Sequence, residues 1–411
     1  MNMMGKAYDV EAICRDFPIL AESVRGKRLV YLDSAGSAQK PRQVIDTIRQ
    51  VYEAEYANVH RGLHFMSEQA SVRYERARAT TRAFLNAEYD HEIIFTKGTT
   101  EAINLVAASY GVANLGHGDE VLISFAEHHS NIVPWHLLQN RTGCVVKAVP
   151  VDEDGTIHLS DFEAMITEKT KIVAITHVSN VLGTVLPVKE IARLAHERGA
   201  VILVDGAQGV VHMPVDLRDL DVDFYAFSGH KLYGPSGIGV LFGKEALLEA
   251  MPPYQGGGGM ISTVTIDGTT CADLPDKFEA GTPPIAQAIG LAAAIDYVSG
   301  VGMSAIAKHE RGLLNYATQR LSAVEGLRFI GTAAGKASVV AFTMDCAHPH
   351  DISTIIDQNG VAVRAGHHCA QPLMERFDLP STARASLGMY NTTEDIDVLV
   401  DSLEKVLEIF R

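Results

Sequence analysis

Short apolar runs alternate with amphipathic stretches between about residues 30 and 244, and this alternation constrains the fold more than any other feature of the chain. The runs are rich in β-branched residues and continuously apolar, which is typical of strands buried on both faces of a sheet. The stretches between them have the spacing of helices with one apolar face. Such alternation predicts a mostly parallel sheet covered by helices on both sides. The runs are HEIIFT, DEVLIS, CVVKAVPV, KIVAITHV, AVILVD and DFYAFS.

The pattern changes in the last third of the chain, and the change predicts a second, smaller domain. Two long helices are expected at about 285–299 and 303–323, followed by alternating strands and a final helix. A chain of 411 residues is also too long for a single hydrophobic core. We therefore expect an α/β protein with a large domain at 30–295, built on a mixed, mostly parallel sheet, and a smaller α+β domain at 296–411. The N-terminal segment 1–29 is expected to pack on the smaller domain.

Composition and charge exclude several classes of partner. The formal net charge is −15 and no run of basic residues occurs, so neither nucleic acid nor an anionic membrane surface is expected to bind. The first residues carry acidic side chains and lack the apolar core of a signal peptide, and no apolar stretch is long enough to span a bilayer. The five cysteines are scattered and form no C-x-x-C pair, which is typical of a protein kept in a reducing cytoplasm.

A lysine lies at the centre of the stretch SGHKLYGPSGIG, in a turn expected between two apolar strands. This residue, Lys231, has a hydroxyl, an imidazole and several glycines beside it, a setting that suits covalent capture of an aldehyde. Upstream, the run VILVD ends on Asp205, at the carboxyl end of a predicted strand, where sheets of this kind bind ligands. A carboxylate there can keep a pyridine nitrogen protonated, so the two residues predict pyridoxal 5'-phosphate as the cofactor.

A phosphate site is expected where the residues GTTE, which include Thr99 and Thr100, follow a strand and open a helix. Backbone N–H groups at a helix start bind phosphate well, and threonine hydroxyls can add to them. The same residues fit an ordinary helix cap, which is the better interpretation if they are considered alone. Considered together with Ser228 and His230, they favour binding of the cofactor phosphate.

Further polar residues follow the predicted strands. Gln208 comes just after Asp205 and could donate a hydrogen bond to the cofactor phenolate oxygen, and Asn180 follows the run VAITHVS. His128, in FAEHHSNIVPW, could stack on a pyridine ring and move protons. The two His-His pairs of the chain could alternatively bind a metal, but adjacent histidines point in different directions and no carboxylate or cysteine cluster with ligand spacing stands nearby. No metal site is therefore expected.

A second His-His pair precedes a cysteine in the stretch RAGHHCAQP. Cysteine is most often a small buried apolar residue, which is our interpretation of the other four. Cys369 differs because it lies in a predicted loop after a glycine and two histidines, where its thiolate could attack sulfur on a cofactor-bound substrate. Arg384 lies on a short strand after that loop. Its planar guanidinium matches an α-carboxylate, although a surface ion pair would explain a lone arginine equally well.

Nine stretches resemble, in order and in spacing, the signatures of the SufS-type cysteine desulfurases, which are pyridoxal-phosphate-dependent enzymes of fold-type I in the class V aminotransferase family. The resemblance covers nearly the whole chain. The compact connection around Cys369 is similar to that of the SufS-like group rather than the NifS/IscS-like group. The stretches are YLDSAGSAQKP, ANVHRGLHFMSEQA, FTKGTTEAINLV, EHHSNIVPW, VDGAQG, FSGHKLYGPSGIGVL, FEAGTPP, RAGHHCAQP and RASLGMYNT.

The resemblance implies a role for each matching residue. Lys231 would bond covalently to the cofactor, Asp205 would pair with its pyridine nitrogen, and Cys369 would attack the substrate sulfur and carry it as a persulfide. Residues implied in catalysis or cofactor binding are Lys231, Cys369, His128, Thr99, Thr100, Asn180, Asp205, Gln208, Ser228, His230 and Thr282. Residues implied in substrate binding are Asn180, Arg364 and Arg384, and those implied to reach the active site of a second subunit are His60, Arg61 and Thr282.

The activity that the resemblance implies is removal of sulfur from L-cysteine with release of L-alanine. The enzyme would be a cytoplasmic homodimer that passes the persulfide to a SufE-like or SufU-like acceptor protein for iron–sulfur cluster assembly. One position departs from the family pattern, because Gly36 stands where alanine is frequent. A glycine there would loosen a loop near the substrate, which bears on fine substrate selectivity rather than on the reaction.

Three alternatives remain open on the residues alone. A selenocysteine lyase of the same fold is the nearest, but selenium elimination needs no nucleophilic cysteine, so Cys369 favours sulfur. An aminotransferase or a kynureninase-like hydrolase would also need Lys231 but leaves RAGHHCAQP unexplained. A non-catalytic scaffold predicts loss of Lys231 or Asp205, and both are present.

Overall fold

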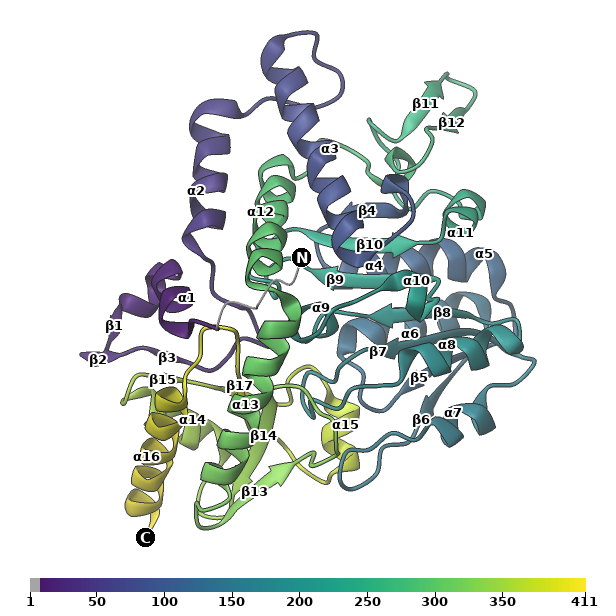
Figure 1. The fold of residues 1–411 in the computed structure, drawn as a ribbon. Coiled ribbons are helices and arrows are strands. Elements are labelled where there is room, and N and C mark those ends of the chain that lie inside the picture. The colour runs from purple at the N-terminus through teal and green to yellow at the C-terminus, as the bar shows by residue number, and fades with distance from the viewer. Residues whose placement is uncertain (1–7) are drawn as a thin grey trace, which may run out of the picture.

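The computed structural model describes residues 8–411, and a seven-stranded sheet lies at its centre (Figure 1). The strand order is β4-β10-β9-β8-β7-β5-β6. Strand β10 runs antiparallel to both of its neighbours, whereas β9, β8, β7, β5 and β6 pair in parallel. The bounds are β4 (Ile93–Thr96), β5 (Glu120–Ser124), β6 (Val145–Val149), β7 (Thr170–Thr176), β8 (Val201–Asp205), β9 (Phe224–Ser228) and β10 (Gly239–Gly243).

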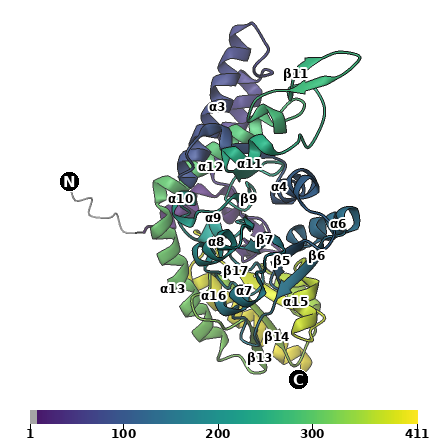
Figure 2. The same ribbon diagram turned by 90° about the vertical axis from the view of Figure 1, so that its right-hand side faces the viewer.

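The apolar character of these strands is explained by burial on both faces of the sheet. Along β7, Val173 and Ile175 belong to one hydrophobic cluster while Ile172 and Ala174 belong to another, because successive side chains point to opposite faces. Helices cover both sides (Figure 2). The predicted mixed, mostly parallel sheet is confirmed. The helices connecting its strands include α4 (Thr99–Val106), α5 (Val112–Asn114), α6 (Val133–Thr142), α7 (Leu159–Met165), α8 (Val188–Glu197), α9 (Gly209–His212), α10 (Leu217–Leu220) and α11 (Glu245–Ala250).

Three helices and a hairpin extend the large domain at the top of Figure 1. Helix α12 (Ile285–Val301) is apolar on most of its surface because it packs between α2 (Arg42–Gln50) and α3 (Phe65–Leu85). The hairpin of β11 (Ile261–Val264) and β12 (Thr269–Cys271) projects away from the body of the protein (Figure 2).

The C-terminal part of the chain forms a four-stranded antiparallel sheet with its own core. Its strand order is β13-β14-β17-β16, and a separate cluster of buried apolar residues lies under it. Helix α16 begins with a capping box in which the Thr392 hydroxyl and the Asp395 carboxylate each accept a backbone N–H of the other residue. The bounds are α13 (Met303–Leu321), β13 (Leu327–Ile330), β14 (Val339–Met344), α14 (Pro349–Asp357), β15 (Val361–Ala362), β16 (Arg364–Gly366), α15 (Gln371–Arg376), β17 (Thr382–Ser386) and α16 (Thr393–Phe410).

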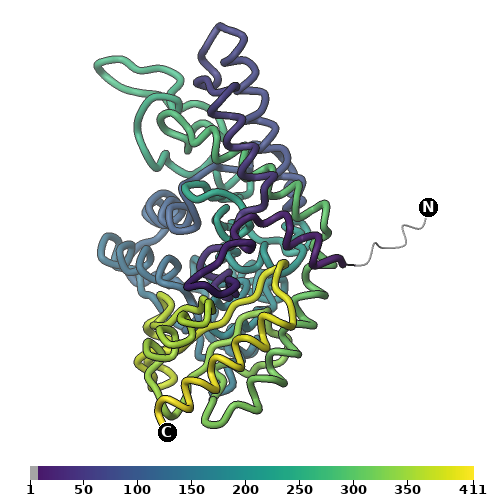
Figure 3. The backbone as a smooth tube through the Cα atoms, turned by 90° about the vertical axis from the view of Figure 1, so that its left-hand side faces the viewer, coloured from purple at the N-terminus to yellow at the C-terminus, as the bar shows by residue number. Residues whose placement is uncertain are grey.

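The N-terminal segment contacts this C-terminal part (Figure 3). It contains α1 (Val10–Asp16), β1 (Ser23–Val24), β2 (Lys27–Arg28) and β3 (Val30–Tyr31), and β3 pairs in parallel with β15. Arg28 also forms an ion pair of 2.8 Å with Asp395. The part of the expected segment before residue 8 lies outside the described residues.

The expected boundary at residue 296 falls inside α12, which runs unbroken to Val301. Gly302, with φ +95° between α12 and α13, is the natural break, because a positive φ ends a helix at little cost only in glycine. We propose the domain boundary there, with β3 grouped with the small domain through its pairing to β15.

Among residues 8–411, no single helix is long and apolar enough to cross a membrane; α12 and α13 pass that test only as a pair, and they meet at a bend of 73°.

Candidate active site

One cavity of about 170 Å³ collects most of the residues that the sequence predicts for the site. It opens where β5, β7, β8 and β9 end, and the small domain closes it from the other side. Strands from one sheet edge and a loop from the small domain therefore converge as expected. Its lining comprises the predicted Thr99, Thr100, His128, Asn180, Asp205, Ser228, His230, Lys231, Arg364, Cys369 and Arg384, together with Ala35, Gly36, Ser130, Ala207 and His368.

Lys231 and Asp205 form the charged floor of this cavity. Burial lowers the pKa of the Lys231 ammonium to about 8, and the nearby Asp205 carboxylate opposes that shift. Burial raises the pKa of Asp205, against the effect of Lys231 and of the Ala207 N–H, which donates to the Asp205 carboxylate at 3.0 Å. The floor thus holds an amine that loses its proton easily beside a fixed carboxylate, both buried away from water.

The turn before α4 and the end of β9 make a cradle of hydroxyl and N–H groups. The Ser228 hydroxyl accepts the Thr99 N–H at 2.8 Å and lies 2.8 Å from the Thr99 hydroxyl, so Thr99 is committed to holding Ser228. Thr100 is exposed at the start of α4 and lines the cavity, where its hydroxyl can face a ligand. A Cβ on Gly239 would lie 2.3 Å from the Gly98 Cα atom, so this close approach of β10 to the turn requires glycine.

His128 is held as a neutral imidazole. Burial, followed by the charge of Lys231, lowers its pKa to about 3. Its Nδ1 accepts the Ser130 N–H at 3.1 Å, which assigns the ring proton to Nε2. His230 is also neutral near pH 7, because burial and then Lys231 lower its pKa to about 4. His128 can therefore donate a proton from Nε2 or lie flat against an aromatic ring without bringing a second positive charge to the floor.

Arg364 and Arg384 share one carboxylate, that of Asp33, which the sequence analysis missed. Arg384 is buried and donates to Asp33 at 2.9 Å and to the Asn180 carbonyl at 2.9 Å. Arg364 is half-exposed and donates to the other Asp33 oxygen at 3.0 Å. Within residues 8–411, the buried Arg384 Nε and Asn180 Oδ1 have no hydrogen-bond partner, which leaves both free to contact a bound molecule.

Cys369 enters the cavity on a tight loop between β16 and α15 and is half-buried. His368 and Cys369 have φ values of +53° and +56°, in the left-handed region that costs a residue with a side chain about 1–2 kcal/mol. Asn180 supports the loop from the large domain by donating to the His368 carbonyl at 2.9 Å. The loop is thus short, strained and held in place by contacts to both domains.

A search for relatives agrees with this geometry. The family model "Aminotransferase class-V" matches residues 30–399. The chain belongs to the class V aminotransferase family. A probable cysteine desulfurase of Halalkalibacterium halodurans is 54% identical over 394 residues, which cover 96% of this chain and 97% of that protein.

Solved structures of cysteine desulfurases have the same fold. The enzyme CsdA of Escherichia coli, in an S-sulfonic acid form, is 40% identical with a TM-score of 0.91 and covers 99% of this chain and 100% of its own. The apo cysteine desulfurase of Thermococcus onnurineus NA1 is 36% identical with a TM-score of 0.93, over 98% of this chain and 100% of its own. The resemblance to cysteine desulfurases and the expected fold-type I architecture are confirmed.

The cavity fits pyridoxal phosphate, the cofactor of the class V aminotransferase family. Asp205 offers a buried carboxylate for a protonated ring nitrogen, and Lys231 offers an amine whose lowered pKa favours bonding to an aldehyde. The start of α4, with Thr100, Ser228 and His230, would hold the phosphate.

Gln208 lies next to this cavity rather than in its wall. Its side chain is buried and donates to the Ala35 carbonyl at 2.9 Å. The expected contact of Gln208 with the cofactor phenolate remains a prediction. In the structure, Gln208 connects the end of β8 to the loop that carries Asp33 and Gly36.

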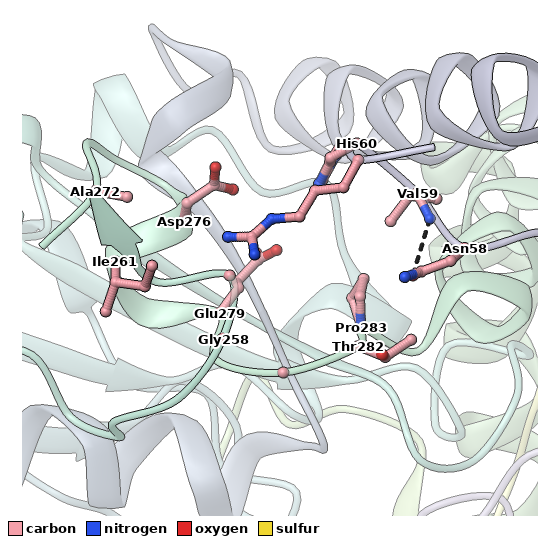
Figure 4. A pocket seen from close by; sticks show the side chains of 13 residues that line it. Asn58, Val59, His60, Gly258, Ile261, Ala272, Asp276, Glu279, Thr282 and Pro283 are labelled. Carbon is pink, nitrogen blue, oxygen red and sulfur yellow. Dashed lines mark hydrogen bonds between the residues drawn. The ribbon is translucent and has the colours of Figure 1, made fainter. Parts of the chain in front are cut away.

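His60, Arg61 and Thr282 do not reach the cavity of their own chain. They line a separate pocket of about 370 Å³ between the start of α3 and the hairpin β11–β12, where Figure 4 shows His60 above Glu279 and Thr282 beside Pro283. The His60 Nε2 atom pairs with the Glu75 carboxylate at 2.9 Å, which raises the pKa of His60. Their role in a second subunit's site stays a prediction.

A buried acid next to His128 was also missed by the sequence analysis. Glu127 is fully buried, and burial raises its pKa to about 8. It accepts hydrogen bonds from the Ser124 hydroxyl at 2.6 Å, the Asn131 amide at 2.7 Å and the Thr176 N–H at 3.0 Å. Glu127 therefore anchors the His128 loop to β7, and the signal available in the sequence was an acidic residue between an apolar strand and a histidine pair.

Among the described residues no cluster of three or more histidine, cysteine, aspartate or glutamate side chains could hold a metal ion.

Proposed function

We propose that this chain is a SufS-type cysteine desulfurase that removes sulfur from L-cysteine, yields L-alanine and receives the sulfur on Cys369 as a persulfide. The observation that carries the proposal is that Lys231, Asp205 and Cys369 line one cavity although two domains supply them. Lys231 and Asp205 suit pyridoxal chemistry in general, whereas a cysteine facing them provides the acceptor that sulfur removal needs.

When bound, pyridoxal phosphate supplies an electron sink for the substrate carbon atoms. The chain supplies the remaining functions. The Cys369 thiolate forms an S–S bond to the substrate sulfur as the C–S bond breaks, and the electron pair of the C–S bond stays with carbon. A proton delivered from the Lys231 ammonium or the His128 Nε2 completes alanine. Arg384, with its free Nε, and Arg364 at the cavity wall would orient the substrate carboxylate.

The test compares Cys369→Ala with Cys346→Ala, a matched change at another half-buried cysteine of the small domain. We expect Cys369→Ala to abolish sulfide release from cysteine while cleavage of selenocysteine largely persists, because selenium elimination needs no thiol acceptor. Alanine and sulfide or selenide are measured for each holoenzyme. Full activity of Cys369→Ala on cysteine would contradict the persulfide mechanism, and loss of both activities in Cys346→Ala would point to a folding defect.

A homodimer is part of the proposal because His60, Arg61 and Thr282 line a pocket remote from their own cavity. Large apolar side chains next to this pocket are exposed in the single chain, with Leu63 fully exposed and Phe65 exposed by 70%. Exposed apolar side chains that lie close together mark a surface on which another protein chain can pack. Mixing Lys231→Ala chains with Arg61→Ala chains would test this: hybrid dimers would contain one intact site and regain activity that neither variant has alone.

An acceptor protein of the SufE-like or SufU-like type and a role in iron–sulfur cluster assembly complete the proposal. The short loop that holds Cys369 supports this, because a persulfide on it cannot travel far and must be collected at the cavity mouth. The five cysteines are all unpaired, which fits a reducing cytoplasm. Alanine formation from cysteine, measured with and without candidate acceptors, would identify the partner as the one that increases turnover.

A further inference from the structure

Two histidines hold the loop that carries Cys369, one at the N–H group of Cys369 and one at its carbonyl group. The Cys369 N–H donates to the His367 Nδ1 atom at 3.1 Å. The Cys369 carbonyl accepts the His129 backbone N–H at 2.7 Å. Because His368 and Cys369 both have positive φ, these contacts oppose relaxation of the loop to a more favourable backbone conformation.

His129 makes a second contact on the far side of the same loop. Its Nε2 accepts the Gln371 N–H, at the first residue of α15, at 3.1 Å. His129 therefore grips the chain on both sides of the buried Ala370, once through its backbone and once through its ring. His129 belongs to the loop after β5 in the large domain, so both contacts join the large domain to the small one.

The ring contact requires an unprotonated Nε2. Burial, followed by the neighbouring His367, lowers the pKa of His129, and the centres of the two rings lie 5.6 Å apart. His129 is adjacent to His128 but outside the cavity lining. The two neighbours thus divide their functions: His128 faces the cavity, and His129 faces the Cys369 loop.

We propose that His129 is a positioning residue for sulfur transfer, which holds the Cys369 loop against the large domain in its left-handed conformation. The proposal rests on the proposed function, in which Cys369 is the sulfur acceptor. According to the proposal, a change at His129 moves the Cys369 sulfur but does not weaken cofactor binding. Cofactor binding depends on Lys231, Asp205 and the cradle at the start of α4.

Three variants of the holoenzyme distinguish the effect of the hydrogen-bond acceptor on the ring from the effect of the size of the side chain. His129→Leu keeps a large side chain without an acceptor, and His129→Gln places an amide oxygen near the position of Nε2. His136→Leu is the control, because His136 is an exposed histidine on the nearby helix α6. The readouts are the cofactor absorbance, kcat and KM for alanine formation from cysteine, and the rate at which iodoacetamide alkylates Cys369, followed by mass spectrometry.

We expect His129→Leu to lower kcat about tenfold or more with KM changed less than about twofold, because a small displacement of a reacting atom has a large effect on rate. The alkylation rate of Cys369 should change several-fold, the cofactor absorbance should stay as in the unmodified enzyme, and His129→Gln should recover most of kcat. His136→Leu should match the unmodified enzyme in every readout.

Unchanged kcat and alkylation rate in His129→Leu would overturn the proposal. So would an equal loss of cofactor absorbance in the Leu and Gln variants, because that result assigns His129 to the folding of the site. Failure of the proposed function looks different: complete alkylation of Cys369 in the unmodified enzyme would then leave sulfide release from cysteine intact. The alkylation rates of the variants would still report whether His129 positions the loop.

Discussion

The Lys231 turn and the Cys369 loop face the same cavity but are built in opposite ways. The turn lies between two buried strands of the central sheet, and burial sets the pKa values of Lys231, Asp205 and His128. The loop lies on the small domain, is half-exposed, and keeps two residues at positive φ through contacts from the large domain. The first region tunes charge by excluding water, whereas the second places one atom within reach of both the cavity and the surface.

This difference agrees with the two halves of the proposed reaction. Electron redistribution in the substrate benefits from a buried site that excludes water, in which charge–charge interactions are strong. Transfer of sulfur to another protein requires a nucleophile that an acceptor can reach. Variants at the floor of the cavity should therefore alter cofactor binding and the chemistry together, whereas variants near the loop should alter sulfur removal and transfer but leave cofactor binding unchanged.

The largest effect is expected from Lys231→Ala. Removing the amine eliminates the covalent link to the cofactor, so turnover should fall at least about 10³-fold. Borohydride reduction should fix the cofactor to the unmodified chain and not to the variant, as read by absorbance after denaturation. Lys97→Ala, at a lysine side chain exposed by 79%, is the control and should behave as the unmodified enzyme. Covalent fixation in the Lys231 variant would place the linkage elsewhere.

Arg384→Lys changes a residue that lies between the two regions and tests whether they act separately. Lysine cannot contact both the Asp33 carboxylate and the Asn180 carbonyl and still offer a planar donor to the substrate, so kcat/KM for cysteine should fall about 10²-fold. The cofactor absorbance should not change, since the hydrogen bonds of Arg384 go to Asp33 and Asn180 rather than to Lys231 or Asp205. Steady-state kinetics give the result, with Arg320→Lys, in a half-exposed ion pair with Asp397, as the control. A loss of bound cofactor in the Arg384 variant would contradict this division.

The neutral state of buried His128 should appear in the stability of the cofactor-free protein. Its pKa is about 3 in the folded chain against 6.5 for the free side chain, so the unfolded chain takes up a proton that the folded chain does not. Stability is therefore lost as pH falls from 6.5 towards 3, by up to about 1.4 kcal/mol per pH unit from this group.

His128→Asn keeps an acceptor for the Ser130 N–H but does not titrate in this range. Its free energy of unfolding, measured by urea denaturation between pH 4 and 6.5, should decline less steeply than that of the unmodified protein. Equal slopes would mean that His128 is solvated in solution.

The smallest effect is expected from Gly36→Ala, at the position where the resemblance leads us to expect alanine. A Cβ on Gly36 would lie 2.5 Å from the Arg364 Nη2 atom and 2.8 Å from the Asp33 Oδ1 atom. The flexible Arg364 side chain would move aside, so KM for cysteine should rise about threefold with kcat nearly unchanged. Gly256→Ala, where a Cβ meets no atom within 4 Å, is the matched control. An unchanged KM would show that Arg364 does not hold the substrate carboxylate.

Much of the floor was predictable because its signals are local. An apolar run that ends on Asp205 and a lysine in a glycine-rich turn can be recognised within a few residues of sequence, and the structure brings both to one cavity. Asp33 was missed because its meaning depends on Arg384, 351 positions away, and no local pattern encodes that contact. The boundary that we propose at Gly302, rather than at residue 296, has a related origin: most positions of α12 are apolar, so its composition does not reveal where the helix ends.

The sequence by itself determined the class of sheet, the chemistry available at the ends of its strands, and the family. Residue types, periodicity and short motifs carry that information because each depends only on residues that are close together in the sequence. Only the tertiary structure decided that a small-domain loop faces Lys231, that Asp33 joins two arginines, and that His129 grips the Cys369 loop. These arrangements depend on the packing of two domains, which fixes distances between residues that are far apart along the chain.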